Sequence, residues 1–437
     1  MDSATDSLTL LVDKMVYGGD GLAHADGRTV FIPYVLPGEE VQALIASSKK
    51  KLAWAKPLSI TKQSASRVKP FCPHFGTCGG CHYQHAAYGA QVQIKTEILR
   101  ETLRRMGGVE WSGEIKTHTA EPAGYRNRAQ WAVRSASPRA LGYYLPETNI
   151  VMPADRCDVL SPALADTFRR LQEITRNGSL PPTVLEIEAF ADSADSMIAL
   201  NVACREFAGP PAQLTALFRE VVPSLESLLL LDQKKNRFEL SGPGYLVQRA
   251  GGYEFRVSHL SFFQVNRFLI EDLLSSVVAG AKGDLALDLY AGVGFFTLPL
   301  GKQFQRTVSV DANLSATRNL RENAEQAGVA VISQNEHSEE FLKKTSERPD
   351  FVVLDPPRTG LGQAAAQKLA DLGPPEVAYL SCDPATLGRD LAVFLQTSRM
   401  PRELSLPAHR YEIAAMDFFD LFPQTFHIET LVRLRRI

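Results

Sequence analysis

The sequence contains no run of about 18 consecutive apolar residues, so it predicts no transmembrane helix. Its first ten residues, MDSATDSLTL, lack the basic-then-apolar pattern of a secretory signal, and we therefore expect a cytoplasmic protein. Cysteine is scarce, with six in 437 residues, and cytoplasmic thiols are kept reduced. These absences argue against a membrane protein and against a secreted protein held by disulfides. The cysteines are better explained as ligands, nucleophiles or core residues.

Acidic residues are missing from one long stretch. No Asp or Glu occurs between Val41 and Thr96, although the whole chain carries a formal net charge of only −2. The basic residues of this stretch are Lys49, Lys50, Lys51, Lys56, Lys62, Arg67, Lys69 and Lys95. A surface of one sign over such a length is typical of a face that binds a polyanion. A solvated basic loop is the alternative, but the length of the stretch favours contact with RNA or DNA.

The first two thirds of the chain contain no internal repeat. Their segments differ in the secondary structure that the sequence pattern predicts. Residues 8–60 alternate short β-like runs with turn signals about every ten residues, which predicts a small β-barrel. Three clustered cysteines and the helical segment QVQIKTEILRETLRRMG follow, and then residues 120–258 mix strands with a few helices. A further helix is expected from about Gln264 to Ala281. We therefore expect three domains, namely 1–62, 63–260 and 261–437.

The last third alternates strands and helices regularly, which is typical of an α/β fold. Five runs read as buried parallel strands, each followed by a helix or a turn: LALDLY, TVSVD, VAVIS, DFVVLD and EVAYLS. The tail differs, because ELSLPAHR and FHIETLVRLRR leave no room for a crossover helix between them. We expect these two runs to form a hairpin that closes the sheet.

A glycine-rich turn follows the first of these strands. In LDLYAGVGFFTLPLG, residues 287–301, Gly292 and Gly294 permit a tight turn and a close approach of the backbone to a ligand. Asp311 ends the next strand about 20 residues on, where an acid can accept hydrogen bonds from both ribose hydroxyls. The third glycine of a dinucleotide site is absent, which favours S-adenosylmethionine over NAD. A glycine-rich turn that binds nothing is the alternative.

The segment FVVLDPPRTG, residues 351–360, ends a strand with Asp355 and two prolines. This makes a rigid corner at the carboxyl end of the sheet, beside the expected cofactor crevice. Methyltransferases that act on exocyclic amines usually carry an aromatic residue after the two prolines, to stack the base. Arg358 occupies that position, so an amine target is disfavoured and a ring carbon is favoured.

A single cysteine stands at the end of the next strand, in YLSCDPATLGRD, residues 379–390. The C5 carbon of a pyrimidine is weakly nucleophilic. A thiolate that adds to C6 makes C5 electron-rich, and a base must later remove the C5 proton. Cys382 is placed for this role, and the dipole of the helix that begins near Asp383 is expected to lower its pKa. Buried packing is the alternative explanation for an isolated cysteine, but the cofactor pattern favours a nucleophile.

In these motifs the chain resembles the RNA uridine-5 methyltransferase family, which makes 5-methyluridine in ribosomal or transfer RNA. The motifs occur in family order: FFQVN (residues 262–266), DLYAGVGFFTLPL, the acid at Asp311, DPPRTG, SCDPATLGRD and FPQTFHIETL (residues 422–431). The resemblance implies a C-terminal Rossmann-like class I methyltransferase domain. It also implies Cys382 as the nucleophile and Glu429 as the base that takes the C5 proton. The cofactor contacts it implies are Gln264, Tyr290, Gly292, Asp311 and Asp355.

One of these positions departs from the family, because Asp311 stands where a longer Glu is usual. Either carboxylate can hold the ribose. Glu429 also agrees with a physical argument, since a carboxylate in an otherwise apolar strand is costly unless it is functional or paired.

The remaining cysteines suggest a metal site. In CPHFGTCGGC, Cys72, Cys78 and Cys81 have the spacing C-x5-C-x2-C, and Cys157 is available as a fourth ligand. All-cysteine ligation suits an iron–sulfur cluster or zinc, and zinc could also recruit His74, His82 or His85. The spacing alone does not choose between them. One branch of the family is similar in having this pattern, which implies a [4Fe-4S] cluster of structural role in a central α+β domain.

The first domain resembles the TRAM module, an OB-like barrel that binds RNA. Arg126 and Arg128 of GYRNRAQW, residues 124–131, are candidates to grip phosphates, and Phe263 is a candidate to stack an exposed base. A surface salt-bridge pair is an equal alternative for the arginines. Because a duplex hides C5 and C6, the target uridine is expected to be flipped out or to lie in a loop.

Barrel and cluster together resemble the ribosomal branch, so the prediction is methylation of uridine C5 in 23S ribosomal RNA. Transfer RNA is the alternative substrate, and no obligate protein partner is implied. An RNA cytosine-C5 methyltransferase is a rival enzyme, although such enzymes usually carry Pro-Cys where this chain has Ser-Cys. A non-catalytic iron–sulfur RNA-binding factor is a rival of another class, and the presence of Cys382 and Glu429 counts against it.

Overall fold

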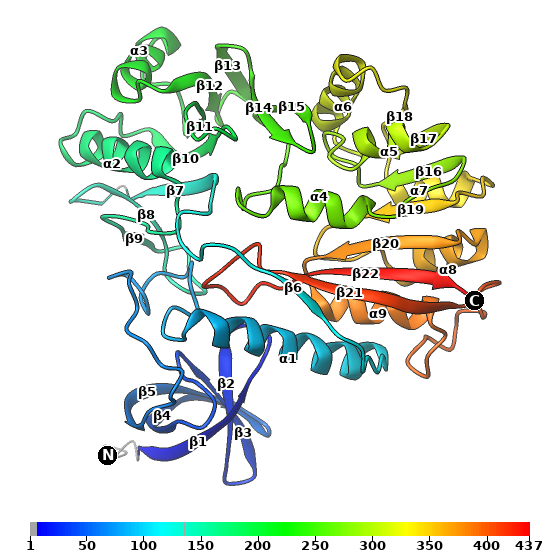
Figure 1. The fold of residues 1–437 in the computed structure, drawn as a ribbon. Coiled ribbons are helices and arrows are strands. Elements are labelled where there is room, and N and C mark those ends of the chain that lie inside the picture. The colour runs from blue at the N-terminus through cyan, green and yellow to red at the C-terminus, as the bar shows by residue number, and fades with distance from the viewer. Residues whose placement is uncertain (1–6, 135) are drawn as a thin grey trace. The chain divides into compact units, whose positions relative to one another are not determined.

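A computed structural model describes residues 7–134 and 136–437 (Figure 1). The chain forms two compact units. The first comprises the described residues up to Thr102 together with Tyr144–Ile150 and Phe422–His427. The second comprises Leu103–Tyr143, Val151–Leu421 and Ile428–Ile437. This division does not test the predicted boundaries after residues 62 and 260, which stay predictions.

The first unit begins with the predicted β-barrel. Its five strands are β1 (Leu8–Met15), β2 (Asp20–Ala25), β3 (Arg28–Pro33), β4 (Glu40–Lys49) and β5 (Leu52–Lys62), closed in the order β1-β2-β3-β5-β4. Buried and exposed residues alternate along the strands, so one face of each strand fills the interior with side chains such as Leu10, Ile32 and Val41. Closure leaves no unpaired edge strand. The barrel prediction is confirmed, with residues 1–6 outside the described part.

After the barrel, an irregular segment leads into helix α1 (Tyr88–Gly107), which contains the predicted helical run. The segment Phe422–His427 packs within the same unit. The Gln424 carbonyl accepts hydrogen bonds from the amides of His82 at 2.7 Å and Tyr83 at 2.9 Å. The buried Lys95 donates to the Phe422 carbonyl at 3.0 Å. Lys95 therefore does not belong to the predicted basic surface.

The second unit contains a mixed sheet of seven strands in the order β13-β12-β11-β10-β7-β8-β9. The strands are β7 (Arg128–Arg134), β8 (Ala140–Tyr144), β9 (Val151–Pro153), β10 (Val184–Ala191), β11 (Ile198–Cys204), β12 (Leu225–Asp232) and β13 (Arg237–Ser241). Helices α2 (Pro162–Arg176) and α3 (Pro211–Val221) contact this sheet. A separate hairpin of β14 (Tyr245–Ala250) and β15 (Tyr253–Ser258) follows.

The same unit contains an eight-stranded sheet in the order β18-β17-β16-β19-β20-β22-β21-β6. Its strands are β6 (Lys116–His118), β16 (Leu285–Leu289), β17 (Arg306–Val310), β18 (Ile332–Gln334), β19 (Phe351–Leu354), β20 (Glu376–Ser381), β21 (Tyr411–Phe419) and β22 (Glu429–Arg436). The helices of this part are α4 (Ile270–Val278), α5 (Thr297–Gln303), α6 (Leu314–Gln326), α7 (Ser338–Lys344), α8 (Gln363–Leu372) and α9 (Pro384–Phe394). Strands β16 to β20 are parallel, as predicted.

Three details of this sheet differ from the sequence predictions. Strand β18 lies at the edge and is mostly exposed rather than buried. The predicted helix from Gln264 to Ala281 is shorter, because residues 264–269 are irregular and α4 starts at Ile270. The tail hairpin is confirmed, but its first strand is Tyr411–Phe419 and not ELSLPAHR, which contains a proline and stays irregular.

Strand β6 adds to this sheet beside β21, in parallel register. No sequence pattern predicted that pairing, since β6 has three residues and no buried run. Among the described helices, none is long and apolar enough to cross a membrane.

Candidate active site

The turn that follows β16 brings the predicted glycine and acid together. The amide of Gly292 donates a hydrogen bond to Asp311 Oδ2 at 2.8 Å. Gly292 has φ of +56°, which disfavours other residues, and a Cβ there would meet no atom within 4 Å. The space beside this backbone is therefore open at the carboxyl end of the parallel strands, where ligands of such sheets bind. Asp311 also accepts from the amide of Asn313 at 2.7 Å.

Tyr290 and Gln264 lie in the segments that flank this turn. Tyr290 has a positive φ of 63°, and its hydroxyl donates to Glu339 Oε1 at 2.8 Å. Gln264 is buried in the irregular segment before α4, and its backbone carbonyl accepts from Asn127 Nδ2 at 3.3 Å. Asn127, within the GYRNRAQW motif, is itself buried. That motif therefore fixes the backbone of the FFQVN segment.

A further acid belongs to this region, although sequence analysis did not single it out. Asp288 lies in the middle of β16 and is fully buried. Thr297 donates to its Oδ2 at 2.5 Å, whereas its Oδ1 has no hydrogen-bond partner among the described residues. The pKa of Asp288 is raised to about 7, chiefly by burial; the Thr297 hydrogen bond opposes this rise, and the nearby Asp355 and Asp311 contribute to it. The signal in the sequence was an Asp inside an apolar strand.

Strand register brings the two predicted catalytic residues together. Cys382 follows β20 directly, and Glu429 is the first residue of β22. The antiparallel register of these strands pairs Ser381 with Thr430. One further step along both strands places Cys382 opposite Glu429. The charge of Glu429 acts directly on the Cys382 thiol, which supports this placement.

Asp355 completes the group of acids at the same end of the sheet. It follows β19, whose Leu354 pairs with Tyr379 of β20 in parallel register. Burial raises the pKa of Asp355 to about 7, and Asp311 adds to this rise. Burial likewise raises the pKa of Glu429 well above its ordinary value, and Asp355 adds to it while Arg358 opposes it. The side chain of Glu429 is only 6% exposed.

The expectation that the α9 dipole lowers the thiol pKa is wrong. Burial raises the pKa of Cys382 to about 12, and Glu429 and Asp355 contribute to the rise, while Arg358 opposes it. Asp383 explains the small influence of the helix. Its carboxylate accepts from the amides of Ala385 and Thr386, both at 2.9 Å, so an anion already occupies the helix N-terminus.

Comparison with known proteins agrees with this geometry. The family model described as tRNA (Uracil-5-)-methyltransferase matches residues 246–437. A protein from Halomonas elongata, named 23S rRNA (uracil(1939)-C(5))-methyltransferase RlmD, is 33% identical over 97% of this chain and 89% of its own length. The chain belongs to the RNA uracil-5 methyltransferase family. It is therefore an S-adenosylmethionine-dependent RNA (uracil-C5)-methyltransferase, as the motifs predicted.

Two other similar proteins extend the comparison. A protein of the same name from Alkalilimnicola ehrlichii is 29% identical over 98% of this chain and 96% of its own length. The crystal structure of the tRNA (uracil-54, C5)-methyltransferase of Pyrococcus abyssi, in complex with S-adenosyl-L-homocysteine, has a TM-score of 0.75. It covers 98% of this chain and 100% of its own, at 22% identity. This likeness shows that the matched part of the chain shares the fold of that enzyme.

In this methyltransferase the Arg128 guanidinium already has protein partners, and its predicted phosphate contact stays a prediction. Its guanidinium pairs with Glu188 at 2.6 Å and donates to the carbonyls of Ser261 at 2.6 Å and His259 at 3.3 Å. These contacts correspond to the salt-bridge alternative, and they anchor the backbone just before FFQVN. The Arg126 Nε donates to the Arg128 carbonyl at 2.8 Å, so an RNA contact of Arg126 stays a prediction.

His259 strengthens the same anchor and was not predicted. Its Nδ1 lies 2.5 Å from Asn201 Oδ1, and its Nε2 lies 2.7 Å from Ser227 Oγ. Burial lowers the pKa of His259 to about 4, so the ring is neutral and can donate at one nitrogen and accept at the other. The ring therefore ties the segment that contains Gln264 to strands β11 and β12.

The prediction that Phe263 stacks a base is wrong. Phe263 is 2% exposed and packs against Phe255 and Phe295, with ring centroids 5.7 Å and 5.3 Å away. Its neighbour Phe262 is 60% exposed. Sequence alone could not choose between adjacent phenylalanines, because the segment is neither helix nor strand and has no period.

The clustered cysteines lie in the irregular part of the first unit. Cys72, Cys78 and Cys81 are each half-buried, and the amide of Gly80 lies 3.4 Å from Cys78 Sγ. Cys78 and Cys81 both raise the pKa of Tyr34, so the two thiols lie near one hydroxyl. Within the described ranges, no three His, Cys, Asp or Glu side chains form a group that could hold a metal ion. The predicted [4Fe-4S] cluster therefore stays a prediction.

The other two cysteines belong to the second unit. Cys157 forms a hydrogen bond with the half-buried Tyr143, whose pKa is raised by loss of solvent and by this thiol. Cys204 is fully buried in β11, as expected for a core residue.

Proposed function

We propose that this enzyme methylates C5 of a uridine in 23S ribosomal RNA through a temporary bond between Cys382 and C6 of the base. The observation that carries the proposal is the register of β20 and β22, which brings the Cys382 thiol and the Glu429 carboxyl group together. They lie at the carboxyl end of the parallel strands, the same end as the open turn after β16. The names of two similar proteins, which specify 23S rRNA, support the choice of RNA. We also expect the enzyme to act in the cytoplasm.

The proposed chemistry assigns one task to each of the two residues. The Cys382 thiol loses its proton to solvent water, and its sulfur forms a bond to C6, which shifts electron density to C5. C5 then carries the new methyl group together with its original hydrogen. Glu429, as a carboxylate, removes that hydrogen as a proton. The electron pair of the C5–H bond restores the C5–C6 double bond and expels the Cys382 sulfur.

The cofactor, when bound, supplies an electrophilic methyl group on a sulfonium sulfur. The residues that we propose to hold it are Gln264, Tyr290, Gly292, Asp311 and Asp355. The site fits a cationic ligand with donor groups, because Asp311 binds the Gly292 amide beside the open space, and the charges of Asp288 and Asp355 lie near that of Asp311. Neighbouring carboxyls raise one another's pKa here, and a bound cation would offset that repulsion.

We further propose that Cys72, Cys78, Cys81 and Cys157 bind a [4Fe-4S] cluster of structural role. The chemistry of the donors supports a soft metal site, since thiolates suit iron–sulfur clusters and zinc. Zinc with histidine ligands is less favoured, because His85 Nε2 already lies 3.1 Å from the Val35 carbonyl. Iron and acid-labile sulfide should be found in anaerobically purified protein and lost in Cys81→Ser. A stoichiometric zinc content without sulfide would contradict the cluster.

The barrel offers a surface for the RNA chain. Strand β5 turns Leu52, Trp54 and Lys56 outward, with Ala53 and Ala55 buried between them. The Trp54 ring is 39% exposed and lies beside Phe31, with centroids 5.8 Å apart. The exposed Lys49, Lys50 and Lys51 form the adjoining β4–β5 turn. Aromatic rings next to cations are what single-stranded RNA requires. We propose this face as the RNA-binding surface of the predicted TRAM module.

Replacing Trp54 by alanine should weaken the binding of single-stranded RNA by at least about fivefold, since stacking of one base contributes about 1 kcal/mol or more. Fluorescence polarisation with a labelled RNA, repeated at several salt concentrations, measures the change. Leu11→Ala is the matched control, because Leu11 is also an exposed apolar residue of the barrel. Equal dissociation constants for the two variants would place the RNA elsewhere. Phe262, on the second unit, is then the next candidate for stacking.

Tritium release tests the reaction itself. RNA labelled with tritium at C5 of uridine should release the label to water when the enzyme and S-adenosylmethionine are present. A non-catalytic RNA-binding factor releases none, and a cytosine-C5 enzyme releases label only from cytidine. Transcripts of 23S ribosomal RNA and of transfer RNA, compared at equal concentration, decide which RNA is the substrate.

A further inference from the structure

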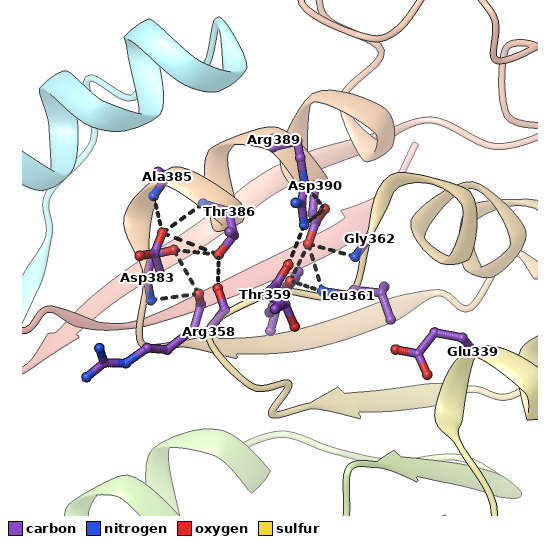
Figure 2. Close-up of polar contacts among 12 residues, drawn as sticks. Glu339, Arg358, Thr359, Leu361, Gly362, Asp383, Ala385, Thr386, Arg389 and Asp390 are labelled. Carbon is purple, nitrogen blue, oxygen red and sulfur yellow. Dashed lines mark hydrogen bonds and ion pairs between the residues drawn. The ribbon is translucent and has the colours of Figure 1, made fainter.

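The loop that follows β19 is fastened to helix α9 by side chains of that helix. Figure 2 shows these contacts along residues 358–362. The Thr386 hydroxyl lies 3.1 Å from the Arg358 carbonyl and 3.2 Å from the Asp383 carbonyl, and it is placed to donate to either. The Arg389 guanidinium donates to the Thr359 carbonyl at 2.8 Å. The Arg358 side chain extends away from these contacts, so the side chains of α9 hold its backbone and not its guanidinium.

Asp390 holds the other end of the same loop. Its side chain is 0% exposed. Its Oδ2 accepts hydrogen bonds from the amides of Leu361 at 2.8 Å and Gly362 at 3.3 Å. The same oxygen accepts from the Tyr379 hydroxyl at 2.7 Å, and Oδ1 accepts from Arg389 Nε at 2.9 Å. A buried carboxylate with this many donors fixes the loop more firmly than a neutral group could.

Gly360 shows how closely the loop approaches the helix. A Cβ on Gly360 would lie 2.6 Å from Asp390 Oδ2, 2.7 Å from Arg389 Nη2 and 3.1 Å from the Thr386 Cβ. Its φ of +74° also disfavours any other residue. The loop therefore packs against all three side chains at one point.

Helix α9 is also the helix that follows the nucleophile. It begins at Pro384, two residues after Cys382. Four charged groups act on the Cys382 thiol. Glu429, Asp355 and Asp383 raise its pKa, and Arg358 lowers it. Arg358 also lowers the pKa of Glu429. The position of this cation therefore matters to both residues of the proposed chemistry.

We propose that Thr386, Arg389 and Asp390 are positioning residues that hold Arg358 at a fixed place beside Cys382 and Glu429. Because one helix anchors both the cysteine and the arginine loop, the two cannot drift apart without breaking these hydrogen bonds. The inference rests on the proposed function, since it assigns a catalytic use to the thiol. The alternative is that the three side chains only stabilise the fold.

Thr386→Val tests the proposal with the smallest change of shape, because valine keeps the volume and loses the hydroxyl. The apparent pKa of Cys382 should rise by about one unit, which is about tenfold less thiolate at a given pH below it. Alkylation by iodoacetamide as a function of pH measures this. The Cys382 peptide is followed by mass spectrometry, since the chain has six cysteines. The turnover number should fall, and the Michaelis constant for S-adenosylmethionine should not change.

Two variants control for loss of stability. Thr386→Ser keeps a hydroxyl and should restore the pH profile. Thr397→Val removes a similar hydrogen bond just beyond the other end of α9, where Thr397 Oγ1 donates to the Gly107 carbonyl at 2.6 Å. It should lower the melting temperature without moving the pH profile. Asp390→Asn should shift the profile in the same direction as Thr386→Val.

The proposal is overturned if Thr386→Val has the pH profile of the unchanged enzyme while its melting temperature falls like that of Thr397→Val. It is also overturned if adding Thr386→Val to Arg358→Gln shifts the thiol pKa as much as it does alone. Failure of the proposed function gives a different result. In that case Cys382→Ala still methylates RNA, whatever the alkylation profiles show.

Discussion

Cys382→Ala is expected to abolish methyl transfer while the protein stays folded and still binds its cofactor. The thiol is the only group in the proposed route that can add to C6, and without that bond C5 stays too weak a nucleophile to take a methyl group. Loss of a catalytic nucleophile costs about 10⁴-fold or more in turnover in enzymes of this kind of mechanism. Tritium release from C5-labelled uridine RNA measures turnover, and calorimetric titration with S-adenosylmethionine measures cofactor binding.

Cys204→Ala provides the matched control. It also removes a thiol from a strand of the second unit, but Cys204 is fully buried in β11 and has no part in the chemistry. The control should lose some stability through the cavity and keep the turnover number of the unchanged enzyme. Appreciable turnover in Cys382→Ala would refute the covalent route. It would not contradict the residues proposed to hold the cofactor.

The pH dependence of the unchanged enzyme follows from the same residues. Burial and three carboxylates raise the pKa of Cys382 to about 12, so the free enzyme at neutral pH holds a protonated thiol. A group that must lose a proton before it reacts becomes more active as the pH rises toward its pKa. Alkylation of Cys382 should therefore increase steadily with pH across the neutral range, and Arg358→Gln should move the curve to higher pH.

The sequence predicted the α/β sheet well because buried parallel strands appear as short apolar runs. Asp311 and Gly292 could be paired in advance because both follow such runs, and ligands of these sheets bind where the strands end. The contact of Cys382 with Glu429 could not be obtained that way. It depends on the register of β20 with β22, and a shift of one residue would turn the carboxyl to the opposite face of the sheet.

Residues at the ends of strands were predicted less well. Arg128, the first residue of β7, looked like a phosphate ligand because the sequence motif carries no sign of its partners. Only the fold reveals that Glu188 and two backbone carbonyls occupy its guanidinium. The predicted direction of the shift in the Cys382 pKa was wrong for a related reason. A helix N-terminus was visible in the sequence, but the expected effect took no account of the Asp383 cap or of the buried acids around the cysteine.

Glu429→Gln is expected to trap the reaction after methyl transfer. Without a carboxylate to take the C5 proton, the C5–C6 double bond cannot re-form, and the sulfur of Cys382 stays bonded to C6. An RNA–protein adduct should accumulate as a retarded band on a denaturing gel, and turnover should fall by about 10²- to 10⁴-fold. Folding should be preserved, because glutamine has nearly the shape of glutamate and burial already disfavours the charged form of Glu429.

The controls separate a trapped adduct from nonspecific cross-linking. Cys382→Ala combined with Glu429→Gln should give no band, since the sulfur is absent. Glu412→Gln, on the exposed face of β21, should release the RNA as fast as the unchanged enzyme. If Glu429→Gln gives no band and still turns over, another carboxyl removes the proton. Asp355 is then the first to test, because its charge acts on both Cys382 and Glu429 and its own pKa of about 7 suits a base near neutral pH.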